Sequence, residues 1–141
     1  MKYMILSYGS QRDYDGMAGQ ATGDDAWTPE EFAGMVEFMR KFNAELEASG
    51  ELVDTRGLAA PVHTRRVSGS TRAGVPVAVT DGPYAETQEV LAGYWIVECD
   101  SFDRATEIAL RLAECPAPRA VAARAFADVR PIDQGADEIQ S

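Results

Sequence analysis

The chain has 141 residues, of which 45% are hydrophobic and 26% charged, and its formal net charge is -10 at pH 7. This length suits one domain with a core of its own, and the composition excludes collagen-like, disordered and membrane-embedded classes. An acidic chain repels phosphate backbones, so we expect no nucleic-acid partner. No apolar run is long enough to cross a bilayer, and Cys99 and Cys115 form neither a disulfide framework nor a zinc motif. We therefore expect a cytoplasmic protein without a metal or a membrane partner.

The first half of the chain contains its clearest elements. Residues 2–8 are apolar on both faces, which predicts a central strand covered on both sides. Residues 9–27 are rich in Gly and Asp and predict a long flexible loop, either a mobile surface loop or a functional lid. The first helix begins at Thr28, which forms a capping box with Glu31, and it ends at Gly50. One apolar stripe runs along this helix: Phe32, Met35, Val36, Met39, Phe42 and Leu46.

Shorter elements follow. Short segments, alternating or largely apolar, predict strands at 51–56, 62–68, 75–79 and 91–99. A second helix begins after a cap at Ser101 or Asp100 and stops before Pro116. A last strand is expected from about residue 123 to 130, and the acidic tail at 133–141 should fray.

The order of these elements is β-α-β-β-(β)-α-β. It predicts an α+β ferredoxin-like unit, in which both helices cover one face of an antiparallel sheet. We assign this unit to a single domain at residues 1–132, followed by the tail at 133–141. Because the strands at 2–8 and 91–99 carry apolar residues at both odd and even positions, both of their faces are apolar, and the other sheet face should also be buried. A second copy packed sheet against sheet is the simplest cover, so we expect a symmetric homodimer.

Residues 80–89 read Thr-Asp-Gly-Pro-Tyr-Ala-Glu-Thr-Gln-Glu. This stretch resembles the signature of the DGPF family, a branch of the YCII-related proteins. Gly93-Tyr94 and the closing residues 129–132 agree with it, and the resemblance covers nearly the whole chain apart from 9–27 and the tail. Tyr84 stands where the family commonly has Phe, and the His-Asp pair suggested for related YCII proteins has no match here. The resemblance implies a dimeric α/β barrel with a pocket between sheet and helices, no generally established reaction, and an association with alternative sigma factors.

The Asp-Gly-Pro-Tyr segment at 81–84 has two interpretations. As a turn, it uses an Asp that accepts backbone hydrogen bonds, a permissive Gly and a Pro of fixed φ. As a site, it aims Asp81 and Glu86 into a pocket beside Tyr84. A desolvated carboxylate there would act as general base, and the phenol would donate a hydrogen bond to a carbonyl or enolate.

Several other side chains are candidates for binding or proton transfer. His63 is the only histidine, and it either shuttles a proton near neutral pH or is a surface or structural residue. Arg65, together with Arg56 and Arg66, either binds an anionic ligand or pairs with nearby carboxylates. Tyr94 and Trp95 point to opposite faces of their strand, so one packs under a helix and the other lies at the dimer face or the pocket.

Two functions follow from these residues. The first is a cofactor-independent enzyme acting on a small polar or aromatic metabolite, with Asp81 as acid/base. The alternative is a non-catalytic ligand-binding or regulatory module, with a sigma factor as a candidate associate. A phosphate-binding Gly loop, a nucleophile elbow and a metal-ligand motif are all absent from the sequence, so we expect no cofactor. Under a third interpretation, the turn at residue 81 is purely architectural.

Overall fold

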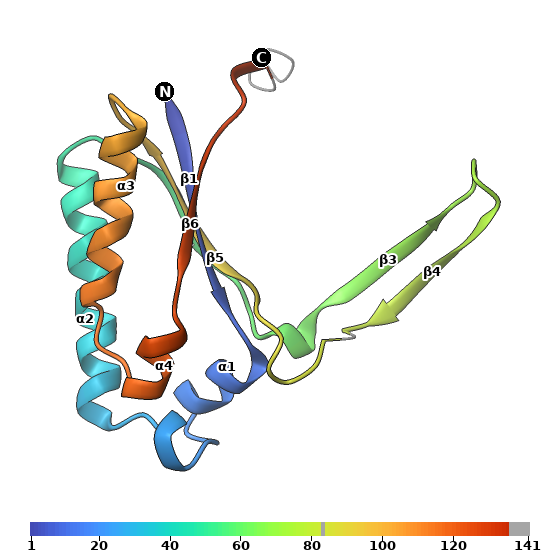
Figure 1. The fold of residues 1–141 in the computed structure, drawn as a ribbon, viewed down its shortest axis with the longest axis horizontal. Coiled ribbons are helices and arrows are strands. Elements are labelled where there is room, and N and C mark those ends of the chain that lie inside the picture. Colours follow the sequence, from blue (N-terminus) through green and yellow to red (C-terminus); the bar gives the residue numbers. More distant parts are fainter. Residues whose placement is uncertain (83, 136–141) are drawn as a thin grey trace.

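The computed structural model describes residues 1–82 and 84–135. Its main layer is a four-stranded antiparallel sheet in the order β2-β5-β1-β6, formed by β2 (Leu52–Gly57), β5 (Val90–Glu98), β1 (Lys2–Gly9) and β6 (Ala127–Pro131). Helices α2 (Pro29–Ala48) and α3 (Phe102–Leu110) lie side by side on one face of this sheet (Figure 1). This is the ferredoxin-like α+β arrangement, and it confirms the predicted fold class.

Both covering helices begin at the caps predicted for them. At the start of α2, Thr28 Oγ1 accepts the Glu31 N–H at 3.1 Å and Glu31 Oε1 accepts the Thr28 N–H at 2.9 Å. Gly50 follows the end of α2 with φ of 79°, the left-handed conformation that glycine adopts without strain. Ser101 caps α3 by accepting the Arg104 N–H at 3.0 Å, and the 3-10 helix η3 (Arg111–Glu114) continues α3.

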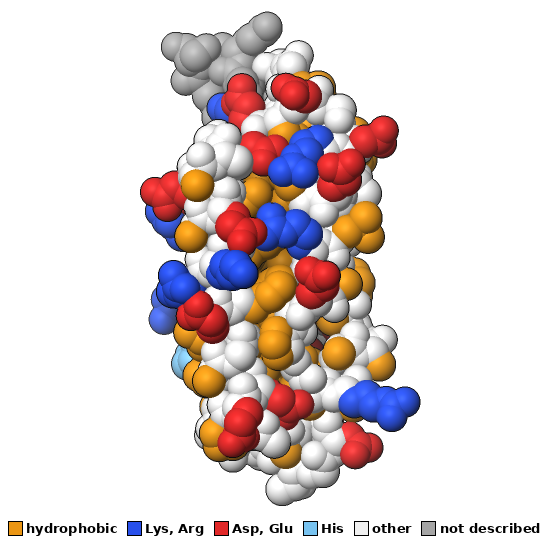
Figure 2. Space-filling view, turned by 90° about the vertical axis from the view of Figure 1, so that its left-hand side faces the viewer, with side chains coloured by type: hydrophobic (Ala, Val, Ile, Leu, Met, Phe, Trp, Pro, Cys, Tyr) orange, Lys and Arg blue, Asp and Glu red, His pale blue; other side chains and the backbone are white. Residues whose placement is uncertain are grey.

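The core lies between the sheet and these two helices. Trp95 donates its indole N–H to Asn43 Oδ1 at 2.8 Å, and its ring meets the Phe42 ring edge-on at a centroid distance of 5.6 Å. The hydrophobic residues of the core are Tyr3, Ile5, Phe42, Leu46, Trp95, Val97, Cys99, Ala105 and Ile108. Figure 2 looks onto the helices and shows hydrophobic side chains in the seam between them, with acidic and basic side chains on both sides.

The segment at 9–27 differs from its prediction, because it contains regular structure. Helix α1 (Gln11–Met17) and the 3-10 helix η1 (Gly23–Asp25) lie within it. The N-cap of α1 is Ser10, whose Oγ accepts the Asp13 N–H at 3.2 Å, and the Asp13 carboxylate accepts the Ser10 N–H at 2.9 Å in return. The expectation of an irregular loop was wrong here because Asp takes the place of the usual Glu or Gln in this capping box.

Two strand boundaries are also corrected. Helix α4 (Arg119–Arg124) precedes β6, so the last strand begins at residue 127 and not near 123. The 3-10 helix η2 (Pro61–His63) occupies the start of the predicted 62–68 strand, because Pro61 fits the first position of a helical turn. The expected tail lies outside the described residues from 136 onward.

Two predicted strands leave the main sheet altogether. β3 (Arg65–Ser70) and β4 (Val75–Asp81) pair only with each other, as a separate two-stranded sheet. This hairpin projects from the side of the main sheet opposite to α2 and α3 (Figure 1). No helix within residues 1–82 and 84–135 covers the other face of the main sheet, where half-buried Met4, Leu6 and Ile96 lie.

Candidate ligand-binding site

A cavity of about 680 Å³ lies between the sheet and the helices, at the end where β1 leads into α1. Its walls come from the ends of the main-sheet strands, from α1, α2 and α3, and from the chain between α3 and β6. They are mainly apolar, and their larger side chains are Met17, Met35, Met39, Leu58, Leu110, Leu112, Val121, Phe126 and Val129. The volume falls in the range typical of small-molecule sites, about 300–1,000 Å³.

Charged side chains meet at one end of this cavity. Asp13 Oδ1 accepts a hydrogen bond from Arg124 Nε at 3.1 Å, and Arg124 Nη1 lies 2.7 Å from Asp25 Oδ1. Burial acts to raise the pKa of Asp13, but the Ser10 N–H and the Arg124 guanidinium outweigh it, so this pKa lies below its ordinary value. Asp13 therefore stays ionised, and Arg124 is committed to two carboxylates.

Glu89 lines the same end of the cavity and is half-buried. Burial raises its pKa above the ordinary value, and the negative charge of Asp13 raises it further, although Arg124 and Arg12 act in the opposite direction. Among the described residues, no side chain supplies Glu89 with a hydrogen bond that would stabilise its charge. Glu89 is therefore the carboxyl group in this cavity that is available to a ligand.

Two aromatic residues complete the polar end. Tyr14 donates its hydroxyl hydrogen to the Leu58 carbonyl oxygen at 2.9 Å, and burial raises its pKa. Trp27 Nε1 is buried and has no hydrogen-bond partner in the part of the chain that the structure describes. Gly16 allows this close packing, because a Cβ at that position would lie 2.8 Å from the Asp25 carbonyl oxygen. The Trp27 side chain lines the cavity, but its Nε1 is packed beside Gly16 in the wall and is not accessible from the cavity.

The residues predicted to be catalytic lie elsewhere. Asp81 and Glu86 are exposed, His63 is exposed in η2, and Tyr84 is half-buried. None of these four side chains lines the cavity. The structure brings Asp13, Glu89 and Arg124 together there in their place.

The Asp-Gly-Pro-Tyr segment packs closely against η2. A Cβ at Gly82 would lie 2.9 Å from the Pro61 carbonyl oxygen, so glycine is needed for this approach. The Arg66 guanidinium lies 5.2 Å from the centroid of the Tyr84 ring, a cation-π contact. Pro83 lies outside the described residues. These contacts fix the base of the β3–β4 hairpin.

The predicted ligand-binding residues are also separated. Arg65 is exposed and lies opposite Asp81 in the hairpin register. Trp95 packs in the core under α2. Tyr94 lies on the sheet face without helices and donates its hydroxyl hydrogen to Asp54 Oδ2 at 3.1 Å. The prediction that Tyr94 and Trp95 point to opposite faces is confirmed.

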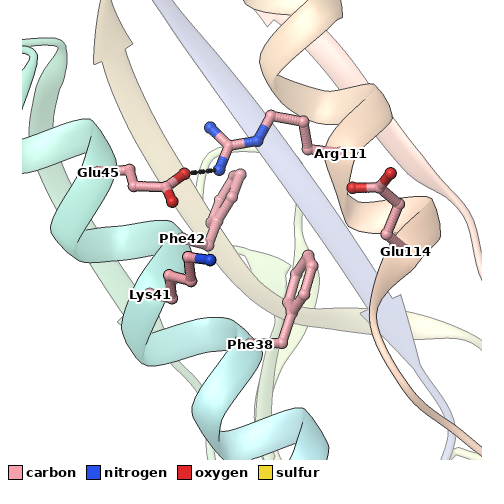
Figure 3. A pocket seen from close by; sticks show the side chains of 6 residues that line it. All are labelled: Phe38, Lys41, Phe42, Glu45, Arg111 and Glu114. Atoms are coloured by element: carbon pink, nitrogen blue, oxygen red, sulfur yellow. Dashed lines mark hydrogen bonds and ion pairs between the residues drawn. The ribbon is translucent and has the colours of Figure 1, made fainter.

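A second hollow, of about 370 Å³, lies on the outer side of the helix layer (Figure 3). The Phe38 and Phe42 rings stack there with centroids 6.0 Å apart. The Arg111 guanidinium lies 5.0 Å from the Phe42 centroid and hydrogen-bonds Glu45. Arg111 lies over the Phe42 ring and is already paired with Glu45. These side chains therefore shield the core from water, and we do not assign the hollow as a ligand site.

The described residues show neither a metal-binding cluster nor a membrane-spanning helix. Among residues 1–82 and 84–135, no three His, Cys, Asp or Glu side chains are grouped so that they could hold a metal ion. Within the same residues, every helix is too short or too polar to span a membrane. Cys99 and Cys115 are free thiols.

A ferredoxin-like sheet with an apolar cavity beneath its helices defines a class of small α+β proteins. The family model of the YCII-related domain matches residues 1–132, and the chain belongs to this family. This membership confirms the resemblance to the YCII-related proteins, and the DGPF branch stays a prediction. No curated protein matches the chain.

Proposed function

We propose that this protein binds a small molecule in the cavity, and that the ligand has an apolar body and a hydroxyl or amino head group. One observation carries the proposal: the walls are mainly apolar, and the charged side chains lie at one end. Small-molecule sites combine these two features, because apolar walls supply affinity and a few polar groups fix orientation. A pocket between sheet and helices is also what the family resemblance implies.

The head group is inferred from the groups that remain free. Asp13 and Arg124 are hydrogen-bonded and Arg124 also forms an ion pair with Asp25, whereas Glu89 has no such cation of its own among the described residues. A hydroxyl or an amine donates a hydrogen bond to the Glu89 carboxylate. A carboxylate ligand would face three acidic side chains, so it should bind more weakly.

Calorimetric titration with three naphthalene probes tests this proposal. 1-Naphthylmethanol, 1-naphthylmethylamine and 1-naphthoic acid share an apolar body and differ in the head group. We expect the alcohol and the amine to bind and the acid to bind more weakly. Glu89→Gln should weaken amine binding by roughly tenfold, since a hydrogen bond to a charged group contributes about 1.5–3 kcal/mol. The matched control is Glu86→Gln, which changes an exposed carboxylate outside the cavity. Absence of binding, or an equal loss in both variants, would contradict the proposal.

Acid–base catalysis is the second candidate function. The predicted base, Asp81, is exposed and outside the cavity, whereas Glu89 lines it. A raised pKa brings Glu89 closer to the working range of a general acid or base. The affinity for 1-naphthylmethylamine should then rise with pH as Glu89 ionises, and Asp81→Asn should leave this profile unchanged. A pH-independent affinity below neutral pH would reject the catalytic candidate.

We also propose that the protein is a homodimer in which the helix-free sheet faces pack together. Met4 lies opposite Ile96 and Leu6 lies opposite Tyr94 in the β1–β5 register, so these half-buried side chains form a continuous patch. A second copy would remove the patch from water. Light scattering of the wild-type chain tests the dimer, and Ile96→Lys should produce monomers because it places a charge in the patch.

A further inference from the structure

The β3–β4 hairpin, which we name the arm (residues 65–81), presents an apolar face to solvent. Val67 pairs with Val79 and Ser70 with Val75, so the four valines 67, 75, 77 and 79 share one face. Their exposed fractions are 71%, 52%, 57% and 65%. The opposite face is formed by Arg66, Ser68, Pro76, Ala78 and Thr80.

The arm has no cover within its own chain among the described residues. Its two strands pair only with each other, and every residue of β4 is exposed. An isolated two-stranded hairpin is marginally stable in water and needs a surface to pack on. A valine-rich face without such a surface indicates an interaction site.

Charge identifies the kind of surface that fits. The arm carries three arginines and one aspartate, which gives it a net charge of +2. Because the whole chain has a net charge of -10, the rest of the chain has a net charge of -12. A basic arm is therefore attracted to an acidic body like its own. The sheet face without helices adds apolar side chains to that body, at Met4, Leu6 and Ile96.

The position of the arm points to the same partner. The arm leaves the main sheet on the side away from α2 and α3, which is the side of the uncovered sheet face (Figure 1). A second copy packed on that sheet face would lie next to the arm, and two-fold symmetry would bring its own arm to the first copy.

We propose that the arm packs its valine face on a second copy of this chain, so that two arms are exchanged across the dimer. The inference rests on the proposed homodimer and adds to it a second, arm-mediated contact. The small-molecule cavity is independent of it, since no arm residue lines that cavity.

The experiment compares two double variants of the full chain by light scattering. Val77→Asp with Val79→Asp changes the valine face, and Ala78→Asp with Thr80→Asp adds the same charge to the opposite face. We expect the valine-face variant to raise the dimer dissociation constant at least roughly tenfold, as for a truncated interface anchor. The control should change it much less. Both variants should keep the wild-type circular dichroism spectrum, because the arm lies outside the core.

Two further results separate this inference from the proposed dimer. If Ile96→Lys gives monomers while the valine-face variant stays dimeric, the sheet dimer holds and the arm exchange is overturned. A monomeric wild-type chain overturns both, whereas binding of the naphthalene probes reports on the cavity alone. A photo-crosslinking residue at position 77 should join two protomers into a product of twice the mass. Crosslinks confined to one chain would reject the exchange, even if the aspartate variants failed to fold.

Discussion

Replacing Arg124 with Met removes the one cation shared by Asp13 and Asp25. The methionine keeps much of the aliphatic length and deletes the guanidinium, so the change is mainly electrostatic. The side chains of Arg124, Asp13 and Asp25 have exposed fractions of 23%, 14% and 24%. Asp13 and Asp25 would then lie beside Glu89 without the positive charge of Arg124. Repulsion between these carboxylates should destabilise the polar end of the cavity and the packing of α1 against the chain that carries residue 124.

The magnitude follows from this partial burial. Removing one partner of a fully buried pair costs about 3–5 kcal/mol, and exposed pairs contribute at most about 1 kcal/mol. Because these side chains retain some exposure, we expect Arg124→Met to lower the free energy of unfolding by about 2 kcal/mol. A typical domain of 5–15 kcal/mol stability would stay folded.

Urea unfolding followed by circular dichroism measures this change. The matched control is Arg40→Met, because Arg40 pairs with Glu37 on the exposed side of α2, where the side-chain exposed fractions are 66% and 61%. That variant should lose much less stability, because water screens an exposed ion pair. Equal losses in the two variants would refute the reasoning that burial makes the Asp13–Arg124–Asp25 cluster structural.

Two more predictions concern the core and the cavity. Phe42→Ala should lower the free energy of unfolding by about 3–5 kcal/mol, because it removes a buried ring that touches Trp95, and urea unfolding checks it. Glu89 has a folded-state pKa above its unfolded value, so its contribution to stability is fully present below about pH 4.3 and is lost as pH rises through the folded pKa. Glu89→Gln should therefore show a smaller decrease in melting temperature between pH 4 and pH 7 than wild type; identical profiles would contradict the assigned pKa direction.

Local sequence signals were enough for the main layer of the fold. The Thr28–Glu31 capping box and the apolar stripe behind it define α2 within a few residues, and the strands at β1 and β5 follow from their composition. For the arm, local signals predicted the strands but not the sheet to which they belong. Valines at 75, 77 and 79 indicate a strand, but alternation is the same in any sheet, so it did not reveal that this strand leaves the main sheet.

The site was harder to predict because its residues come from separate parts of the chain. Asp13 and Arg124 meet across 111 positions, and neither belongs to a local motif that indicates a ligand. His63 is conspicuous as the single histidine and Asp81 as part of the family signature, but neither property indicates a position at the cavity. One usable signal was present: Ser10 and Asp13 fit a capping box once Asp is accepted at its third position, and that would have predicted α1.

The central claim, that the cavity binds an apolar ligand with a polar head, is tested most directly by the two indole N–H signals in an NMR titration with 1-naphthylmethanol. The Trp27 side chain lines the cavity, whereas Trp95 lies in the core and its Nε1 is bonded to Asn43. Trp27→Phe assigns the two signals. We predict that the Trp27 signal shifts with added probe while the Trp95 signal stays in place. A stationary Trp27 signal at saturating probe would contradict the account.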